Sequence, residues 1–160
     1  MLKPSELSPT AREAFHQEAE ARIAVFNYDI AQPSGRPKDV SILAQTPLMY
    51  AVVQVVREGG ENNLHYHTNS DTLWTVLRGR VRFYGVGDSL LGELGPLESI
   101  MMPGGARYWF EKIGPEELAL QQIIAVDRSG GESQRINIDK HKAWMEGDAF
   151  LTVYDQRGES

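Results

Sequence analysis

The sequence GGENNLHYH (residues 59–67), followed after a short turn by DTLWTVLRGR (71–80), decides the fold. Its two histidines, His65 and His67, are two positions apart. On a strand, side chains two apart project from the same face, separated by roughly 6.5–7 Å along the chain. If residues 65–67 form a strand, the two imidazoles can therefore reach one metal ion or one ligand.

These residues resemble the first motif of the cupin superfamily, which reads G, five residues, H-x-H, three or four residues, E, six residues, G. Gly59, His65, His67 and Gly79 fall in register with it. Thr72 stands where a metal-binding cupin has its glutamate. Asp71 lies one position away, and a shift of one residue turns a strand side chain to the other face, so we do not count it as a ligand.

The segment PGGARY (103–108) resembles the second cupin motif, P-x-G-x-x-H preceded by a glycine. Tyr108 occupies the histidine position and Leu97 the position of the leading glycine. The resemblance therefore implies the cupin fold with two of the four usual metal ligands, His65 and His67.

Short β-rich runs separated by Gly and Pro turns predict an all-β fold, a sandwich or barrel. The resemblance specifies this as a cupin jelly roll, also called a double-stranded β-helix. The predicted strands cover residues 48–56, 73–77, 80–84, 90–94, 99–102, 107–111 and 118–126.

A helix is predicted near the N-terminus. Residues 10–13 (TARE) have the spacing of a capping box, and Ala11, Phe15, Ala19 and Ile23 form an apolar stripe. We therefore expect a single domain, in which residues 1–45 form a helix and extension that pack on the barrel and residues 46–160 form the cupin barrel.

Composition places the chain among ordinary globular proteins. It has 160 residues, of which 41% are hydrophobic and 24% charged, and it has no cysteine. No apolar run approaches the roughly 20 residues of a membrane span, and nothing indicates a secretion signal or a disulfide framework. We expect a cytoplasmic protein that does not bind membranes. The net charge of −6 argues against nucleic acid as a partner.

By the register of the family, six side chains face the barrel interior: His65, His67, Thr72, Trp74, Tyr108 and Phe110. Gln54 and either Gln121 or Gln122 could add polar contacts, although the sequence does not fix their parity. We predict a ligand pocket formed by Thr72, Trp74, Tyr108, Phe110 and Gln54. The expected partners are a small-molecule ligand and, as the family commonly shows, a second copy of the chain in a homodimer.

Three hypotheses for the function follow. The first is small-molecule binding in the barrel, with a weak divalent metal (Zn, Fe, Mn or Ni) at His65 and His67, to which a deprotonated Tyr108 could be a third ligand. The second is a metal-dependent oxygenase or isomerase. The third is metal-free acid–base chemistry of the kind that cupin nucleotide-sugar epimerases perform with a histidine base and a tyrosine acid. The sequence leaves open whether the protein is an enzyme.

Overall fold

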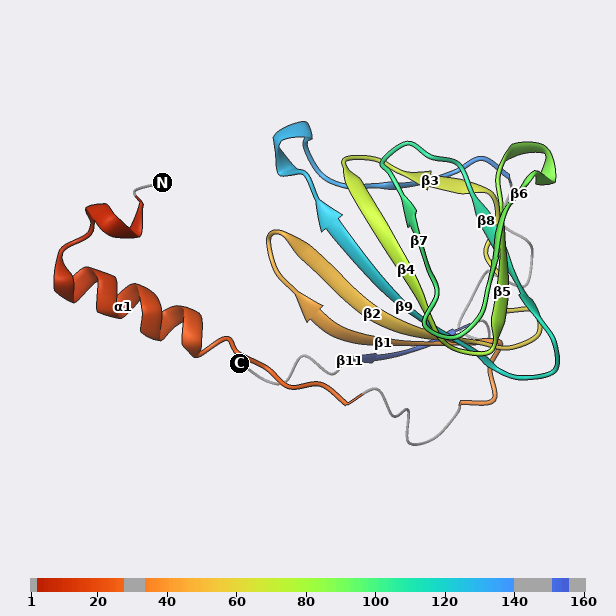
Figure 1. Ribbon diagram of the computed structural model, residues 1–160, viewed down its shortest axis with the longest axis horizontal. Coiled ribbons are helices and arrows are strands. Elements are labelled where there is room, and N and C mark those ends of the chain that lie inside the picture. Colours follow the sequence, from red (N-terminus) through yellow and green to blue (C-terminus); the bar gives the residue numbers. More distant parts are fainter. Residues whose placement is uncertain (1–2, 28–33, 140–150, 156–160) are drawn as a thin grey trace.

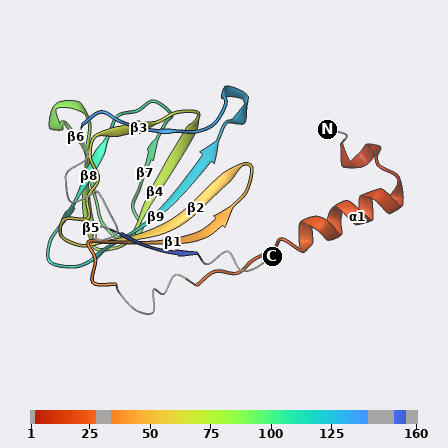
Figure 2. The same ribbon diagram turned by 180° about the vertical axis from the view of Figure 1, so that it is seen from behind.

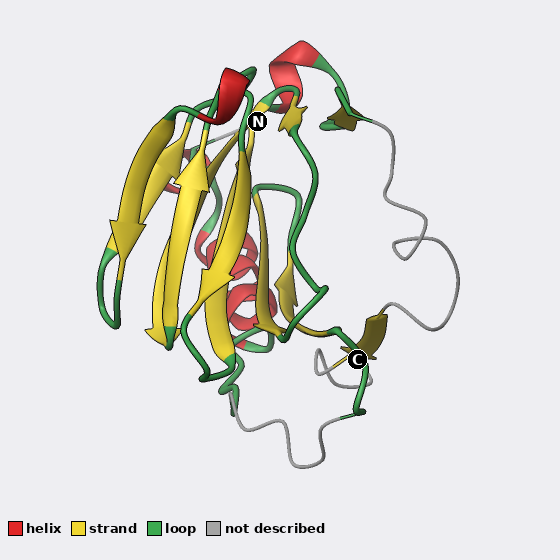
Figure 3. Ribbon diagram, turned by 90° about the vertical axis from the view of Figure 1, so that its right-hand side faces the viewer, coloured by secondary structure: helices red, strands yellow, loops and turns green. Residues whose placement is uncertain are grey.

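A computed structural model describes residues 3–27, 34–139 and 151–155. Strands make up the body of the molecule (Figure 3). The element order is η1 (Pro4–Glu6), α1 (Pro9–Glu20), β1 (Lys38–Gln45), β2 (Met49–Val56), β3 (His65–His67), β4 (Ser70–Arg78), β5 (Arg80–Tyr84), η2 (Val86–Asp88), β6 (Leu90–Leu94), β7 (Ser99–Met102), β8 (Trp109–Ile113), β9 (Leu118–Val126), η3 (Arg128–Gly130), β10 (Arg135–Asn137) and β11 (Leu151–Asp155).

The described strands form three sheets. One has six strands in the order β11-β1-β2-β9-β4-β7, one has three in the order β6-β5-β8, and β10 pairs with β3 in the third. All pairs are antiparallel except β1 and β11, which are parallel. The two larger sheets face each other, and β3 lies along the rim between them (Figures 1 and 2).

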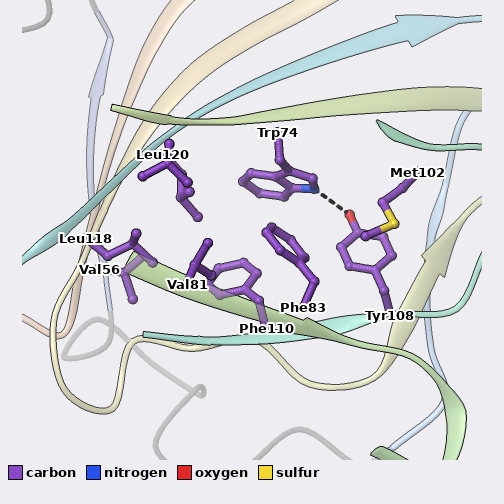
Figure 4. Close-up of a cluster of buried hydrophobic side chains, with 10 residues drawn as sticks. Val56, Trp74, Val81, Phe83, Met102, Tyr108, Phe110, Leu118 and Leu120 are labelled. Atoms are coloured by element: carbon purple, nitrogen blue, oxygen red, sulfur yellow. Dashed lines mark hydrogen bonds between the residues drawn. The ribbon is translucent and has the colours of Figure 1, made fainter. Parts of the chain in front are cut away.

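An apolar core fills the space between the two larger sheets (Figure 4). Strand alternation explains its composition, because in β4 and β5 every second residue is buried. Arg80 and Arg82, on the opposite face of β5, bind the carboxylate of Glu93 on β6. The core consists of Val56, Trp74, Val76, Val81, Phe83, Met102, Tyr108, Phe110, Leu118 and Leu120.

The strand predictions hold closely. The runs at 80–84, 90–94, 99–102 and 118–126 coincide with β5, β6, β7 and β9. β4 begins earlier than predicted, at Ser70, because the turn between β3 and β4 needs only Asn69 in the left-handed conformation (φ 51°). β8 begins later, at Trp109, because Tyr108 makes only an isolated bridge, to His65.

Two features of the N-terminal region differ from expectation. The helix begins at Pro9, and its N-cap is Ser8, whose Oγ accepts a hydrogen bond from the Ala11 amide (3.3 Å); the predicted cap at Thr10 is therefore wrong. β1 places residues 38–45 inside the six-stranded sheet, so the strands begin before the predicted boundary at residue 46. No residue of α1 is buried. Packing of this extension on the barrel stays a prediction.

Gly79, a motif glycine, is required by the tight β4–β5 turn. Its φ is +79°, and a Cβ at this position would lie 2.6 Å from the carbonyl oxygen of Glu117. A left-handed conformation costs an L-residue about 1–2 kcal/mol, and overpacking against the backbone adds about 1–3 kcal/mol.

We therefore expect Gly79→Ala to lower the free energy of unfolding by roughly 2–5 kcal/mol in urea denaturation. Gly87→Ala is the matched control, because φ there is +65° but a Cβ would meet nothing within 4 Å. Equal losses in the two variants would show that the close approach at Gly79 has no energetic consequence.

Candidate functional site

β3 places both histidines on one face, as the H-x-H spacing predicted. The strand pairs with β10, so that His65 lies opposite Asn137 and His67 opposite Arg135. The two imidazole centroids are 5.2 Å apart, with their planes at 82°. His65 is 2% exposed and His67 is half-buried. The imidazoles thus sit together at the rim of the barrel.

The hydrogen bond of His65 defines its tautomer. Its Nδ1 lies 2.7 Å from the carbonyl oxygen of Asn63. Because a carbonyl oxygen only accepts, the neutral ring carries its proton on Nδ1 and has its lone pair on Nε2. Nε2 is therefore available as a hydrogen-bond acceptor or as a ligand.

Tyr108 lies directly beside His65. Their ring centroids are 4.6 Å apart, and the two residues exchange backbone hydrogen bonds of 3.1 and 2.9 Å. The Tyr108 hydroxyl accepts a hydrogen bond from Trp74 Nε1 at 3.2 Å (Figure 4). Burial raises the pKa of Tyr108 to about 12. The phenol therefore keeps its proton at neutral pH and can donate it to a third group.

Thr72, Trp74 and Phe110 face the interior, as predicted, with exposed fractions of 1%, 2% and 0%. Trp74 and Phe110 pack edge to face at 5.6 Å and are also part of the apolar core. The Thr72 hydroxyl is different: it is buried and has no hydrogen-bond partner among the described residues. Such an atom marks a place for water or a ligand.

The parity of the glutamines is settled by the register of β9. Gln122 lies opposite Trp74 and is 6% exposed, so it is the inward residue of the pair 121–122. Its Oε1 accepts a hydrogen bond from Gln54 Nε2 at 2.8 Å. The Oε1 atom of Gln54 is buried and, within the described parts of the chain, has no partner. Gln54 therefore lies in the interior as predicted.

Two cationic residues that the sequence analysis did not single out also reach this region. Lys38, on β1, is 7% exposed, and its Nζ lies 5.4 Å from the ring centroid of Phe110. Arg135, on β10, donates from Nη2 to Asn63 Oδ1 at 2.6 Å and from Nη1 to Asn137 Oδ1. Alternation of Lys38 with Val40 and Ile42 on the inner face of β1 is the signal that could have identified Lys38.

Burial and the charge of Arg135 lower the pKa values of Lys38 and of both histidines. Burial, and then the charge of Arg135, lowers the pKa of Lys38 to about 8. The same two causes lower the pKa of His65 to about 3 and that of His67 to about 4. At neutral pH both imidazoles are therefore uncharged, and the positive charge of the site belongs to Lys38 and Arg135.

The described residues do not fit a divalent metal ion. Among them, no three His, Cys, Asp or Glu side chains come together in a way that could hold one. Asp71 is exposed and accepts a hydrogen bond from the Gly104 amide at 2.9 Å, so it points away from the histidines as expected. His65 and His67 lie beside two cationic groups and a protonated phenol, and a metal ion generally takes three or more protein ligands. The predicted metal site gains no support here.

A surface pocket of about 520 Å³ lies outside this group of residues. It is formed by turns and strand ends and includes none of the predicted site residues. Its lining is Asn69, Ser70, Asp71, Pro103, Gly104, Ala125, Val126 and Asp127.

Solved structures confirm the class of fold. An uncharacterised conserved protein with a double-stranded β-helix domain from Klebsiella pneumoniae matches 72% of this chain and 98% of its own, with 19% identity and a TM-score of 0.60. An RmlC-like cupin from Desulfovibrio desulfuricans matches 64% and 97%, with 15% identity and a TM-score of 0.54. The cupin domain of Cnp3 from Schizosaccharomyces pombe matches 65% and 76%, with 19% identity and a TM-score of 0.55.

The protein therefore has the cupin fold, as the two motifs predicted. No protein-family sequence model matches the chain, and neither does any curated protein sequence. In the described residues, no helix combines the length and the apolar character needed to cross a membrane.

The lowered pKa values of the histidines make stability depend on pH. An unfolded histidine has a pKa near 6.5, so between about 6.5 and about 3 the unfolded chain binds protons that buried His65 does not. The free energy of unfolding therefore falls as pH falls through this window, by up to about 1.4 kcal/mol per pH unit for each fully neutral histidine.

We expect His65→Asn, whose amide can still donate to the Asn63 carbonyl, to show a shallower pH dependence of unfolding than the wild type between about pH 6 and pH 4. His16→Asn, an exposed position on α1, serves as the control and should leave the slope unchanged. An unchanged slope in His65→Asn would mean that this imidazole protonates freely in the folded protein.

Proposed function

We propose that the protein binds a small organic molecule inside the barrel, without depending on a resident metal ion. The observation that supports this proposal is that neutral hydrogen-bonding groups are buried among aromatic side chains. His65 offers an acceptor and Tyr108 a donor, while the buried Thr72 hydroxyl has no partner in the described chain. Ligand sites are typically apolar with a few convergent polar groups of this kind.

The polar groups and the apolar surface would contribute differently. Trp74 and Phe110 supply aromatic surface for the body of the ligand, at the cost of little side-chain entropy, because both are already held in the core. The hydroxyls of Thr72 and Tyr108 supply orientation. Because these hydroxyls are buried, a ligand that leaves them unpaired loses free energy, which favours molecules with matching polar groups.

Proton transfer is the second candidate, favoured by the contact of His65 with Tyr108 at 4.6 Å between ring centroids. This pair is similar in kind to the histidine base and tyrosine acid of cupin epimerases. An imidazole with a pKa of about 3 is, however, a weak base at neutral pH. Incorporation of solvent deuterium into a bound ligand would separate this activity from simple binding.

Metal-dependent oxygenase or isomerase activity is less well supported, because the described residues do not supply a metal-binding group. Homodimerisation also stays a prediction, and light scattering on the purified chain tests it.

Tyr108→Phe tests the proposed binding site. Removing the hydroxyl leaves the Trp74 indole N–H without its acceptor, which costs about 1–3 kcal/mol of stability. The variant should still fold, and it should lose most of the thermal stabilisation that small molecules from a screening panel give the wild type, a stabilisation of RT ln(1 + [L]/Kd).

Tyr84→Phe is the matched control. Tyr84 lies on β5 with its ring stacked on Trp109 at 4.5 Å, and it donates to Glu111 on the outer face. Its ligand response should equal that of the wild type. A panel that stabilises wild type and Tyr108→Phe equally would place the binding site away from Tyr108.

A further inference from the structure

The N-terminal arm, residues 3–27, carries apolar side chains that are exposed to solvent. Figures 1 and 2 show α1 apart from the barrel, and none of its residues is buried. Phe15 is 45% exposed, and Ile23 and Val25, just beyond the helix, are 78% and 97% exposed. A helix of twelve residues is only marginally stable in water, and packing of its apolar stripe normally supplies the missing free energy. We therefore expect the arm to pack on another surface.

The outer face of the six-stranded sheet carries an apolar surface of this kind. On β4, Leu73 alternates with the inward residues Thr72 and Trp74 and is 40% exposed. The register places Leu73 opposite Met101 on β7, which is 57% exposed, and opposite Ile123 on β9, which is half-buried. Residues opposite each other share one face of a sheet. Leu73, Met101 and Ile123 therefore form one apolar surface, the outer patch.

The surface pocket of about 520 Å³ adjoins the outer patch and carries two carboxylates. Asp71 lines it from the same face of β4 as Leu73, and Asp127 lines it from the end of β9. Asp71 accepts a hydrogen bond from the Gly104 amide, and Asp127 accepts one from the Ser129 amide. Within the described ranges neither carboxylate forms an ion pair. The pocket therefore suits a cationic side chain.

The arm carries a cation in the matching position. Arg22 lies in the turn that extends α1, where its amide donates to the Ala19 carbonyl at 3.1 Å. Residues seven apart share one side of a helix, so Arg22 lies on the side of Phe15. Its guanidinium makes no hydrogen bond or ion pair with any part of the chain that the structure describes. A guanidinium binds carboxylates through parallel N–H groups.

We propose that two copies of the chain exchange their N-terminal arms. The apolar side of each arm, with Phe15 and Ile23, covers the outer patch of the other copy, and Arg22 enters the pocket beside that patch. Each copy carries both surfaces, so a two-fold axis forms every contact twice and closes the assembly as a dimer. This inference goes beyond the proposed function and does not rest on it.

Charge reversal tests the contact between the arm and the pocket. We expect sedimentation of the full-length wild type to show a dimer. Arg22→Asp, and separately the double variant Asp71→Arg with Asp127→Asn, should each raise the dissociation constant of the dimer about tenfold or more. An equimolar mixture of the two variant proteins should recover dimers, because one contact of the mixed dimer is then wild type and the other has both charges reversed.

Two reversals at other sites are the matched controls. Lys112→Asp lies on β8 in the three-stranded sheet, and Glu116→Arg is exposed in the loop before β9, at the opposite end of that strand from Asp127. Both should sediment as the wild type does. Circular dichroism confirms that each variant is folded.

The apolar contact has its own test. Ile23→Ser on the arm and Leu73→Ser on the outer patch should each weaken the dimer about tenfold or more, because each removes a large apolar side chain from the interface. Leu90→Ser, at a position on β6 that is 59% exposed, is the control and should leave the dissociation constant unchanged.

A monomeric wild type would overturn the inference. So would a dimer whose dissociation constant is the same in Arg22→Asp and Leu73→Ser as in the wild type, or variant proteins that stay monomeric when they are mixed. Ligand binding is measured separately, as the thermal stabilisation that Tyr108→Phe removes. If the arm exchange fails, the proposed function therefore still stands or falls on that measurement.

Discussion

The backbone of His65 and that of Tyr108 exchange two hydrogen bonds, of 3.1 and 2.9 Å, in an isolated β-bridge. This bridge joins the rim strand β3 to the chain that enters β8, and so connects the two-stranded sheet to the three-stranded one. It brings the two sequence motifs into contact although they are far apart along the chain. The imidazole of His65, the phenol of Tyr108 and the indole of Trp74 meet because of it.

The bridge also fixes the chemistry of the site. It buries His65 and Tyr108 to 2% exposure each, and burial is the first cause of both pKa shifts. The imidazole is consequently neutral and the phenol protonated at neutral pH. The motif of metal-binding cupins adds the carboxylate of a glutamate, which favours a cation. In this chain the neutral residue Thr72 takes that position.

The sequence predicted most of the barrel because its strands are short, alternating and bounded by turns. β5, β6 and β9 were predicted residue for residue, and alternation placed Thr72 and Trp74 on the inner face. β1 was missed because it carries two charged residues. One of these, Asp39, is fully buried and is paired at 2.7 Å with Arg57, which directly follows β2. A partner contributed by a distant segment cannot be read from the local pattern.

The same reason explains why Lys38 and Arg135 were not predicted from the sequence. Lys38 reaches the interior through the pairing of β1 with β2, and Arg135 through the pairing of β10 with β3. Both pairings depend on tertiary structure, and β10 is too short, at three residues, to show a periodic pattern. The motifs therefore predicted the aromatic and imidazole groups of the site but not the groups that set its charge.

The most direct test of this account is the transition-metal content per chain, measured by mass spectrometry on protein purified without a histidine tag or chelator. The account predicts far less than one ion per chain, also after incubation with Zn, Fe, Mn and Ni salts and removal of the excess. One tightly held ion per chain, lost in His65→Asn and retained in Asp71→Ala, would contradict it. A metal ion generally takes three or more protein ligands, and among the described residues no such group surrounds His65 and His67.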